Sequence, residues 1–178
     1  MNQIKLVNEI TINDKELQDR CMKFAIECTK TTSEFNIRNG STSNVSKLIN
    51  DRYNAVLAEW AVYFHVIQNG GSCQEPDMEI YEAKQKSHGA DLVLTDGTEL
   101  SIKSQLRDSV NRVGMSFLTM KWAFNSQKHR RVMYVICEPN NVFKVYKCGA
   151  LKDMIKGECK YEKARATKDA FYLTIGRN

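Results

Sequence analysis

The sequence predicts an α/β domain in which helices flank a central mixed β-sheet. Two segments with apolar residues at helical spacing come early in the chain, and four or five short runs with strand character follow them. This order is typical of a sheet covered by helices. The chain has 178 residues, 42% of them hydrophobic, which suffices for one core and is short for two. We therefore expect a single domain over residues 1–178, with a helical region at 1–70 and a sheet-bearing core at 76–178.

Both long helices are expected in the helical region. Residues 13–29 predict the first, because apolar side chains recur there every three or four positions. Residues 29–44 are rich in Ser, Thr, Asn and Gly, which predicts a loop. A second, longer helix is expected from a cap within residues 43–46 to about residue 68, because Asn69-Gly70-Gly71 is a typical helix end.

The sheet-bearing core is expected to contain most of the strands. Val, Ile, Phe and Tyr are frequent in its short apolar runs, and Asn, Gly and Pro separate them. The predicted elements are a short strand at 79–83, a hairpin within 88–105, a helix within 110–126, strands at 132–137 and 142–147, a short helix at 150–156 and a closing strand at 171–176.

The composition favours a cytoplasmic protein that is soluble and has no membrane partner. No apolar run approaches the roughly 20 residues of a membrane span. The first ten residues lack the apolar stretch and cleavage site of a signal peptide. The six cysteines form no Cys-x-x-Cys pair, so we expect reduced thiols that pack as small hydrophobes.

The positive charge is concentrated in the C-terminal segment. Residues 1–143 hold 17 Lys or Arg and 17 Asp or Glu, whereas residues 144–178 hold nine and four, which accounts for the whole net charge of +5. Such a segment suits either contact with phosphates or a solvated lysine-rich face.

The predicted hairpin carries the most informative pattern in the chain. Polar residues occupy alternate positions of its second strand, so they share one face. They are Glu99, Ser101, Lys103 and Gln105. An aspartate, Asp91, begins the first strand, close to this polar row.

The turn decides whether Asp91 joins that face. If Asp96-Gly97 is a two-residue turn, Asp91 lies opposite Ile102 and points away from Lys103. If residues 95–97 form a three-residue loop with Gly97 in the left-handed conformation, Asp91 pairs with Ser101 and shares its face. Gly at the third loop position suits the second arrangement, and the sequence leaves both open.

An aspartate beside a lysine, with a further carboxylate near, suits metal-dependent hydrolysis of phosphodiesters. Mg²⁺ prefers oxygen ligands, and a bound metal polarises the phosphate and activates an attacking water. An ammonium group orients that water or offsets the growing charge. The sequence contains neither a Gly-x-Ser-x-Gly elbow nor a Gly-x-x-x-x-Gly-Lys loop, which disfavours serine-hydrolase and nucleotide-hydrolase chemistry.

These residues resemble the PD-(D/E)XK nucleases, which have the restriction-endonuclease-like fold. The resemblance covers residues 45–105 and rests on Glu59 in a long helix, Asp91 before an apolar strand, and Ser101-Ile102-Lys103 on the next strand. It implies a restriction-endonuclease-like core. It also implies that Asp91 binds the metal, that the carbonyl of Ile102 adds a ligand, and that Lys103 serves the attacking water. Gln105 matches the polar residue that often follows the lysine in that family.

The chain departs from the family where Ser101 replaces a carboxylate. Glu99 on the same strand or Glu59 from the helix is expected to supply it as a metal ligand, and Asp108 is a third choice. A second match, Pro76-Asp77 with Glu82-Ala83-Lys84, follows the family's letters more literally. Only four residues separate its two acids, and no continuous apolar strand surrounds it. We therefore place the site at the hairpin.

The expected function is that of an Mg²⁺-dependent DNA endonuclease, restriction-like or phage-type, in which Mn²⁺ substitutes for Mg²⁺. Cutting both strands of a duplex usually takes two sites, so a homodimer is expected. Basic residues are expected to contact the DNA backbone. They are Arg107, Arg112, Lys121, Lys128, Arg130 and Arg131. The alternatives are a Holliday-junction-resolvase-like nuclease, a nucleic-acid-binding protein on the same fold without cleavage, or a structural protein.

Overall fold

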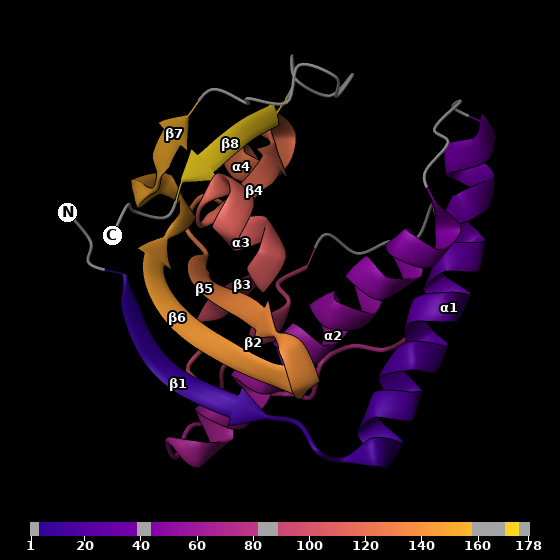
Figure 1. The fold of residues 1–178 in the computed structure, drawn as a ribbon. Coiled ribbons are helices and arrows are strands. Elements are labelled where there is room, and N and C mark those ends of the chain that lie inside the picture. Colours follow the sequence, from indigo (N-terminus) through magenta and orange to yellow (C-terminus); the bar gives the residue numbers. More distant parts are fainter. Residues whose placement is uncertain (1–3, 39–43, 82–88, 158–169, 175–178) are drawn as a thin grey trace.

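Figure 1 shows a curled five-stranded sheet with two long helices on one side and a smaller three-stranded sheet beyond its other side. The structure is a computed structural model, and it describes residues 4–38, 44–81, 89–157 and 170–174. The protein is therefore an α/β protein with a mixed sheet, as the sequence predicts.

The described ranges of the chain contain eight strands and four α-helices. The strands are β1 (Lys5–Thr11), β2 (Leu92–Val93), β3 (Glu99–Leu106), β4 (Ser116–Met120), β5 (Arg131–Glu138), β6 (Val142–Ala150), β7 (Ile155–Gly157) and β8 (Ala170–Thr174). The helices are α1 (Lys15–Arg38), α2 (Val45–Gln68), α3 (Arg107–Val113) and α4 (Lys121–Gln127), with short 3-10 turns at Pro139–Asn141 and Leu151–Asp153.

The larger sheet has the order β1-β6-β5-β3-β2. Its central pair, β3 and β5, is parallel and in register from Leu100 opposite Arg131 to Leu106 opposite Cys137. The other pairs in this sheet are antiparallel. Strand β2 is much shorter than β3, so it covers only the beginning of the β3 edge. The rest of that edge is where the candidate site lies.

The first strand is a difference from the sequence prediction, which has no strand before residue 13. Strand β1 pairs with β6, and of its seven side chains only that of Ile10 is buried. An edge strand with one buried residue has almost no alternating pattern, which explains why the prediction was wrong there. The region that was expected to be helical, residues 1–70, thus also contributes an edge strand to the sheet.

The two long helices match the prediction in place and differ in length. Helix α1 continues to Arg38, whereas the sequence predicts a loop from residue 29. Helix α2 begins after Asn44, whose side chain accepts hydrogen bonds from the N–H groups of Ser46 and Lys47, so the predicted cap is confirmed. The helix ends at Gln68, before Asn69 and the glycine pair, as predicted.

Each face of the larger sheet packs against its own cluster of apolar side chains. Residues of α1 and α2, among them Cys21, Leu57 and Val62, cover the face that carries Leu100 and Ile102. The opposite face carries Val132, Tyr134 and Ile136 and packs on β4, α4 and the turn at Leu151–Asp153. The sheet therefore separates two cores, and among the described strands none pairs with the outer edge of β3 beyond the short β2.

The small sheet has the order β4-β8-β7. The predicted closing strand is confirmed as β8, and the predicted short helix at 150–156 is a 3-10 turn followed by β7. No strand forms at residues 79–81, which corrects the expectation of a strand at 79–83; residues 82 and 83 lie outside the described residues. No helix in the described ranges has the length and apolar character needed to cross a membrane. The five cysteines within those ranges are free thiols.

Candidate active site

The hairpin turn brings Asp91 opposite Ser101. The N–H of Leu94 donates to the carbonyl of Thr98 (3.0 Å), and the N–H of Gly97 donates to the carbonyl of Leu94 (2.9 Å). Gly97 has a φ of 80°, the left-handed value that favours glycine at this loop position. Leu92 pairs with Leu100 in the same register. The three-residue loop is therefore confirmed, and the two-residue alternative is wrong.

Asp91 lies at the open edge of β3 and is held there by two hydrogen bonds. Its N–H donates to the carbonyl of Leu100 (3.0 Å), and its Oδ2 accepts from the N–H of Ile102 (2.5 Å). The N–H and the carbonyl of one strand residue point to the same side of the strand. The carbonyl of Ile102 therefore faces the same edge as the Asp91 carboxylate, which is the arrangement expected of two metal ligands.

Glu59 belongs to α2, which packs against β3. It lies between Ala58 and Trp60, both buried, and is itself only partly exposed. The pKa of the Glu59 carboxyl is raised to about 8: burial is the largest cause, the negative charges of Asp91 and Asp77 also raise the pKa, and the positive charge of Lys103 lowers it. The pKa of the Glu59 carboxyl thus responds to the charges of Asp91 and Lys103, the two residues with which the sequence groups it.

Lys103 lies on β3 two positions after the buried Ser101. Its ammonium group is 6.0 Å from the ring centroid of Phe117, at the limit of a cation–π contact. The positive charge of the same ammonium group lowers the pKa of Glu59.

Glu99 forms an ion pair with Arg130. Its Oε2 accepts a hydrogen bond from Nε of Arg130 at 2.7 Å, and the other end of that guanidinium donates to the carbonyl of Gly89 (2.8 Å). Glu99 is absent from the charges that act on Glu59. Glu99 thus has a cationic partner in Arg130, whereas the pKa of Glu59 responds to the charges of Asp91 and Lys103.

Gln105 has hydrogen-bond partners at both ends of its side-chain amide. Its amide nitrogen donates to Oγ of Ser109 (3.0 Å) and to the carbonyl of Gly114 (3.2 Å). Its amide oxygen accepts from the N–H of Ser116 (3.1 Å) and from the hydroxyl of Tyr134. With both ends occupied, Gln105 ties β3 to the connection that leads into β4.

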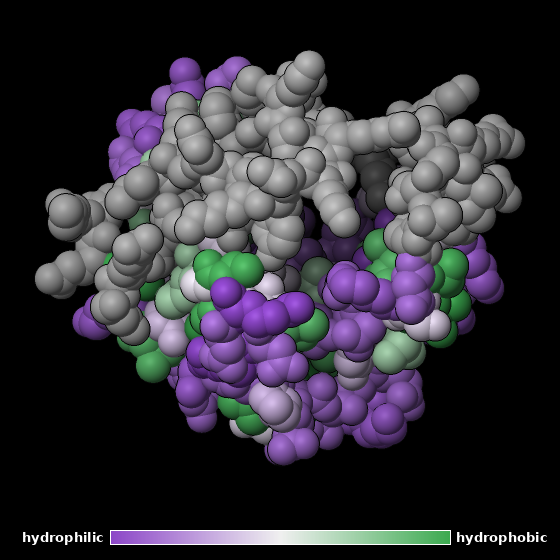
Figure 2. All heavy atoms as spheres, turned by 45° about the horizontal axis from the view of Figure 1, so that its top comes forward, coloured by the Kyte–Doolittle hydropathy of each residue, from purple (hydrophilic) through white to green (hydrophobic). Residues whose placement is uncertain are grey.

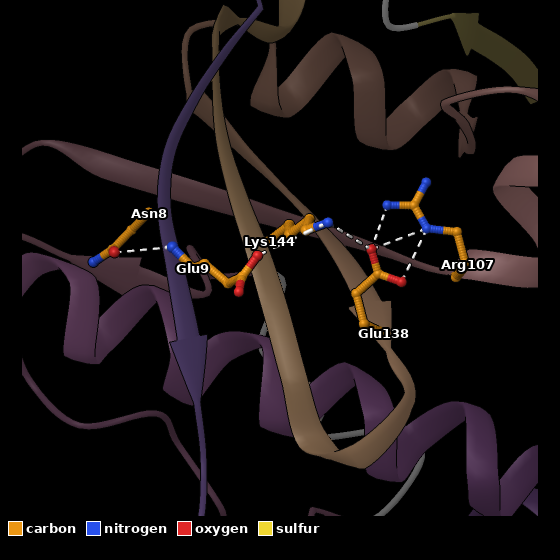
Figure 3. A network of polar contacts seen from close by, with 5 residues as sticks. All are labelled: Asn8, Glu9, Arg107, Glu138 and Lys144. Atoms are coloured by element: carbon orange, nitrogen blue, oxygen red, sulfur yellow. Dashed lines mark hydrogen bonds and ion pairs between the residues drawn. The ribbon is translucent and has the colours of Figure 1, made fainter.

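Two of the basic residues expected on DNA are held in ion pairs. Arg107 donates both Nε and Nη2 to the Glu138 carboxylate, as Figure 3 shows, and Lys144 approaches the same carboxylate at 3.3 Å and that of Glu9 at 3.8 Å. The side chain of Arg130 is only 12% exposed. Both guanidinium groups thus have a carboxylate partner within the protein.

The other basic candidates remain on the surface. Arg112, Lys128 and Arg131 are exposed, and the side chain of Lys121 lies outside the described residues. The N–H of Lys152 donates to the carbonyl of Lys128 (3.0 Å), which places a further exposed lysine beside Lys128. Phe124 is buried in the second core, so it does not stack on bases.

An open hollow of about 510 Å³ lies beside α3 and is lined by Asp108, Asn111 and Arg112. On the face drawn in Figure 2, hydrophilic residues predominate among the described ones, and the hydrophobic ones form small separate groups. Asp108, the third choice for the missing carboxylate, lines this hollow and is not among the charges that act on Glu59.

The second match to the family pattern contributes one residue near the site. Asp77 acts on Glu59, a role that the sequence reasoning missed although it noted the Pro76-Asp77 pair. Glu82 and Lys84 lie outside the described residues. Within the described ranges of the chain, no three His, Cys, Asp or Glu side chains are grouped closely enough to hold a metal ion. The oxygen atoms that could coordinate a metal ion are those of the Asp91 and Glu59 carboxylates and of the Ile102 carbonyl.

Comparison of the chain with protein-family models, with curated proteins and with solved structures found no match.

Proposed function

We propose that the protein is an Mg²⁺-dependent DNA endonuclease whose site is formed by Glu59, Asp91 and Lys103. The observation that carries this proposal is the raised pKa of the Glu59 carboxyl. A carboxyl whose pKa is raised to about 8 by burial and by neighbouring negative charge lies where a cation would relieve the repulsion. The donors are all oxygen atoms, which suits Mg²⁺, and Mn²⁺ accepts the same ligands.

Each residue has a separate role in this proposal. Asp91 and Glu59 would hold the metal, with the Ile102 carbonyl as a further donor on the same edge. Lys103 would orient the attacking water and offset charge on the phosphate, because an ammonium group is a hydrogen-bond donor with a positive charge. A bound Mg²⁺ supplies polarisation of the phosphate and a lower pKa of the water.

The order of elements supports a restriction-endonuclease-like core. Helix α2 with Glu59 comes first, the β2–β3 hairpin with Asp91 and Lys103 follows, and β5 then pairs with β3 in parallel. This is the arrangement that the resemblance to PD-(D/E)XK nucleases implies. The exposed cations Arg112, Lys128 and Arg131 are proposed to contact the DNA backbone, and a homodimer is proposed to cut both strands.

A second candidate is a nucleic-acid-binding protein that does not cleave. Ser101, in place of the usual carboxylate, is buried, and the described residues offer no three-residue metal group. In this alternative the exposed cations bind DNA, and the charged groups of Glu59, Asp91 and Lys103 have no catalytic role.

Cleavage of supercoiled plasmid separates the two candidates. The protein is incubated with plasmid and Mg²⁺ or Mn²⁺, beside the variants Asp91→Ala and Lys103→Ala. Cutting that either variant abolishes supports the nuclease. DNA that is shifted in a gel but stays uncut in every divalent metal supports the binding protein.

A further inference from the structure

We propose that Arg130 is a positioning residue for Asp91, and that Glu99 holds Arg130 in place for this task. The proposal rests on the proposed function in so far as Asp91 binds a metal. It gives a role to two residues for which the sequence suggests different ones, a DNA contact for Arg130 and a metal ligand for Glu99.

The contacts of Arg130 connect β3 with the segment that precedes Asp91. Nε of Arg130 donates to Oε2 of Glu99 on β3 (2.7 Å), and Nη1 donates to the carbonyl of Gly89 (2.8 Å). Gly89 is two residues before Asp91. The guanidinium therefore joins the first residue of β3 to the chain that leads into the site, and its rigid planar fork fixes both directions at once.

Asp91 is thus fixed from two ends. Asp91 itself donates its N–H to Leu100 and accepts from the N–H of Ile102. Two residues before it, the carbonyl of Gly89 accepts from Arg130. Strand β2 adds only Leu92 and Val93 to the ladder, so few sheet hydrogen bonds support this segment. An arginine that replaces missing ladder bonds is well placed to set the path of the backbone at Asp91.

Burial supports a local structural role for this arginine. The Arg130 side chain is 12% exposed, whereas that of its partner Glu99 is 51% exposed. The guanidinium is thus largely shielded from solvent, and its charge is directed to Glu99. The neighbouring Arg131 is exposed and remains the better phosphate contact.

Hydrogen exchange at the Ile102 amide tests the proposal without metal or DNA, because that amide donates to the Asp91 carboxylate. Exchange is measured by NMR for the wild type, Arg130→Met, Arg130→Lys and the milder Glu99→Gln. The control is Lys15→Met, which removes one positive charge and breaks an exposed ion pair with Asp19. The amide of Val135, in the buried strand β5, reports on the fold as a whole.

We expect Arg130→Met to speed exchange at Ile102 by about tenfold or more, with Val135 and the control unchanged. Arg130→Lys should recover some of the protection, and Glu99→Gln should lose about threefold. Equal acceleration at Ile102 and Val135 would show a role in general stability only and would overturn the proposal, as would unchanged exchange at Ile102. If Arg130→Met does not fold, Glu99→Gln decides by the same comparison.

A cleavage arm separates this proposal from the proposed function. Arg130→Met should raise the Mg²⁺ concentration for half-maximal plasmid cutting by about fivefold or more, and leave the affinity for DNA unchanged. A wild type that never cuts refutes the nuclease, while the exchange data still decide whether Arg130 positions Asp91. A variant that cuts with the Mg²⁺ dependence of the wild type overturns the positioning role alone.

Discussion

The Oδ2 atom of Asp91 accepts a hydrogen bond from the N–H of Ile102 at 2.5 Å. Asp91 comes just before β2 begins, where β3 extends beyond its short partner strand. The bond takes the place of a ladder hydrogen bond there. It also turns the carboxylate toward the edge that the Ile102 carbonyl faces. One side chain thus closes the hairpin and offers a charge to the candidate site, and two substitutions can separate these tasks.

Asp91→Asn keeps an oxygen that can accept from Ile102 and removes the charge. We expect its free energy of unfolding to stay within about 1 kcal/mol of the wild type, while plasmid cleavage falls by about a hundredfold or more. Asp91→Ala should lose cleavage equally and also cost about 1–3 kcal/mol, since the buried-edge N–H loses its acceptor. Urea unfolding and cleavage assays measure the two effects. Equal stability of both variants would contradict the structural role.

The raised pKa of Glu59 predicts that stability falls as pH rises. Between the ordinary value near 4.5 and about 8, the folded protein keeps a proton that the unfolded chain has lost. Folding therefore becomes less favourable across this window, by an amount on the order of 3 kcal/mol that partial exposure of Glu59 reduces. The loss should end above pH 8, and Glu59→Gln should remove it.

Denaturant unfolding at about pH 5, 6, 7 and 8 measures this dependence. The matched control is Glu75→Gln on the exposed segment after α2, which should keep the slope of the wild type. Metal binding favours the ionised carboxyl, so affinity for Mn²⁺ should rise with pH up to about 8. A Glu59→Gln variant with an unchanged pH slope would show that Glu59 is not the titrating group.

Lys103 is predicted to act in the chemical step. Lys103→Met should lower the cleavage rate by about a hundredfold or more, because it removes a cation from the place where charge grows. The affinity for uncut DNA should change little, since the surface cations remain. Single-turnover cleavage and gel shifts give the two quantities. Lys103→Arg should recover less than a tenth of the rate, because its planar group does not reproduce the ammonium geometry.

Gln105 is predicted to be a stabilising residue with no direct role in catalysis. Gln105→Leu leaves the Ser116 N–H and the Tyr134 hydroxyl without their acceptor and should cost about 2–3 kcal/mol in the free energy of unfolding. Gln74→Leu, at an exposed position, is the control and should cost less than about 0.5 kcal/mol. Loss of cleavage without loss of stability would instead place Gln105 in the site.

The sequence predicted the features that depend on local pattern. The position of α2, its cap at Asn44 and the strands β5, β6 and β8 follow from periodicity and turn residues. The left-handed Gly97 was one of two alternatives, and only the hydrogen bonds of Leu94 distinguished them.

The remaining features depend on contacts between distant residues. The choice between Glu59 and Glu99 required the partner of Glu99, which lies 31 positions away at Arg130. The sequence suggests DNA contacts for Arg130 and Arg107. In the structure Arg130 forms an ion pair with Glu99, and Arg107 forms one with Glu138. Local spacing does not predict such pairs, because the residue type alone does not distinguish an exposed arginine from a buried one.

The central claim is that Glu59 and Asp91 jointly bind a divalent cation at the open edge of β3. Crystals grown near pH 8, close to the pKa of the Glu59 carboxyl, and soaked in Mn²⁺ test it through the anomalous scattering of the metal. The account predicts one strong anomalous peak in contact with the carboxylates of Asp91 and Glu59, which disappears in Asp91→Asn. A map with no peak at Asp91, or with the peak unchanged in that variant, would contradict it.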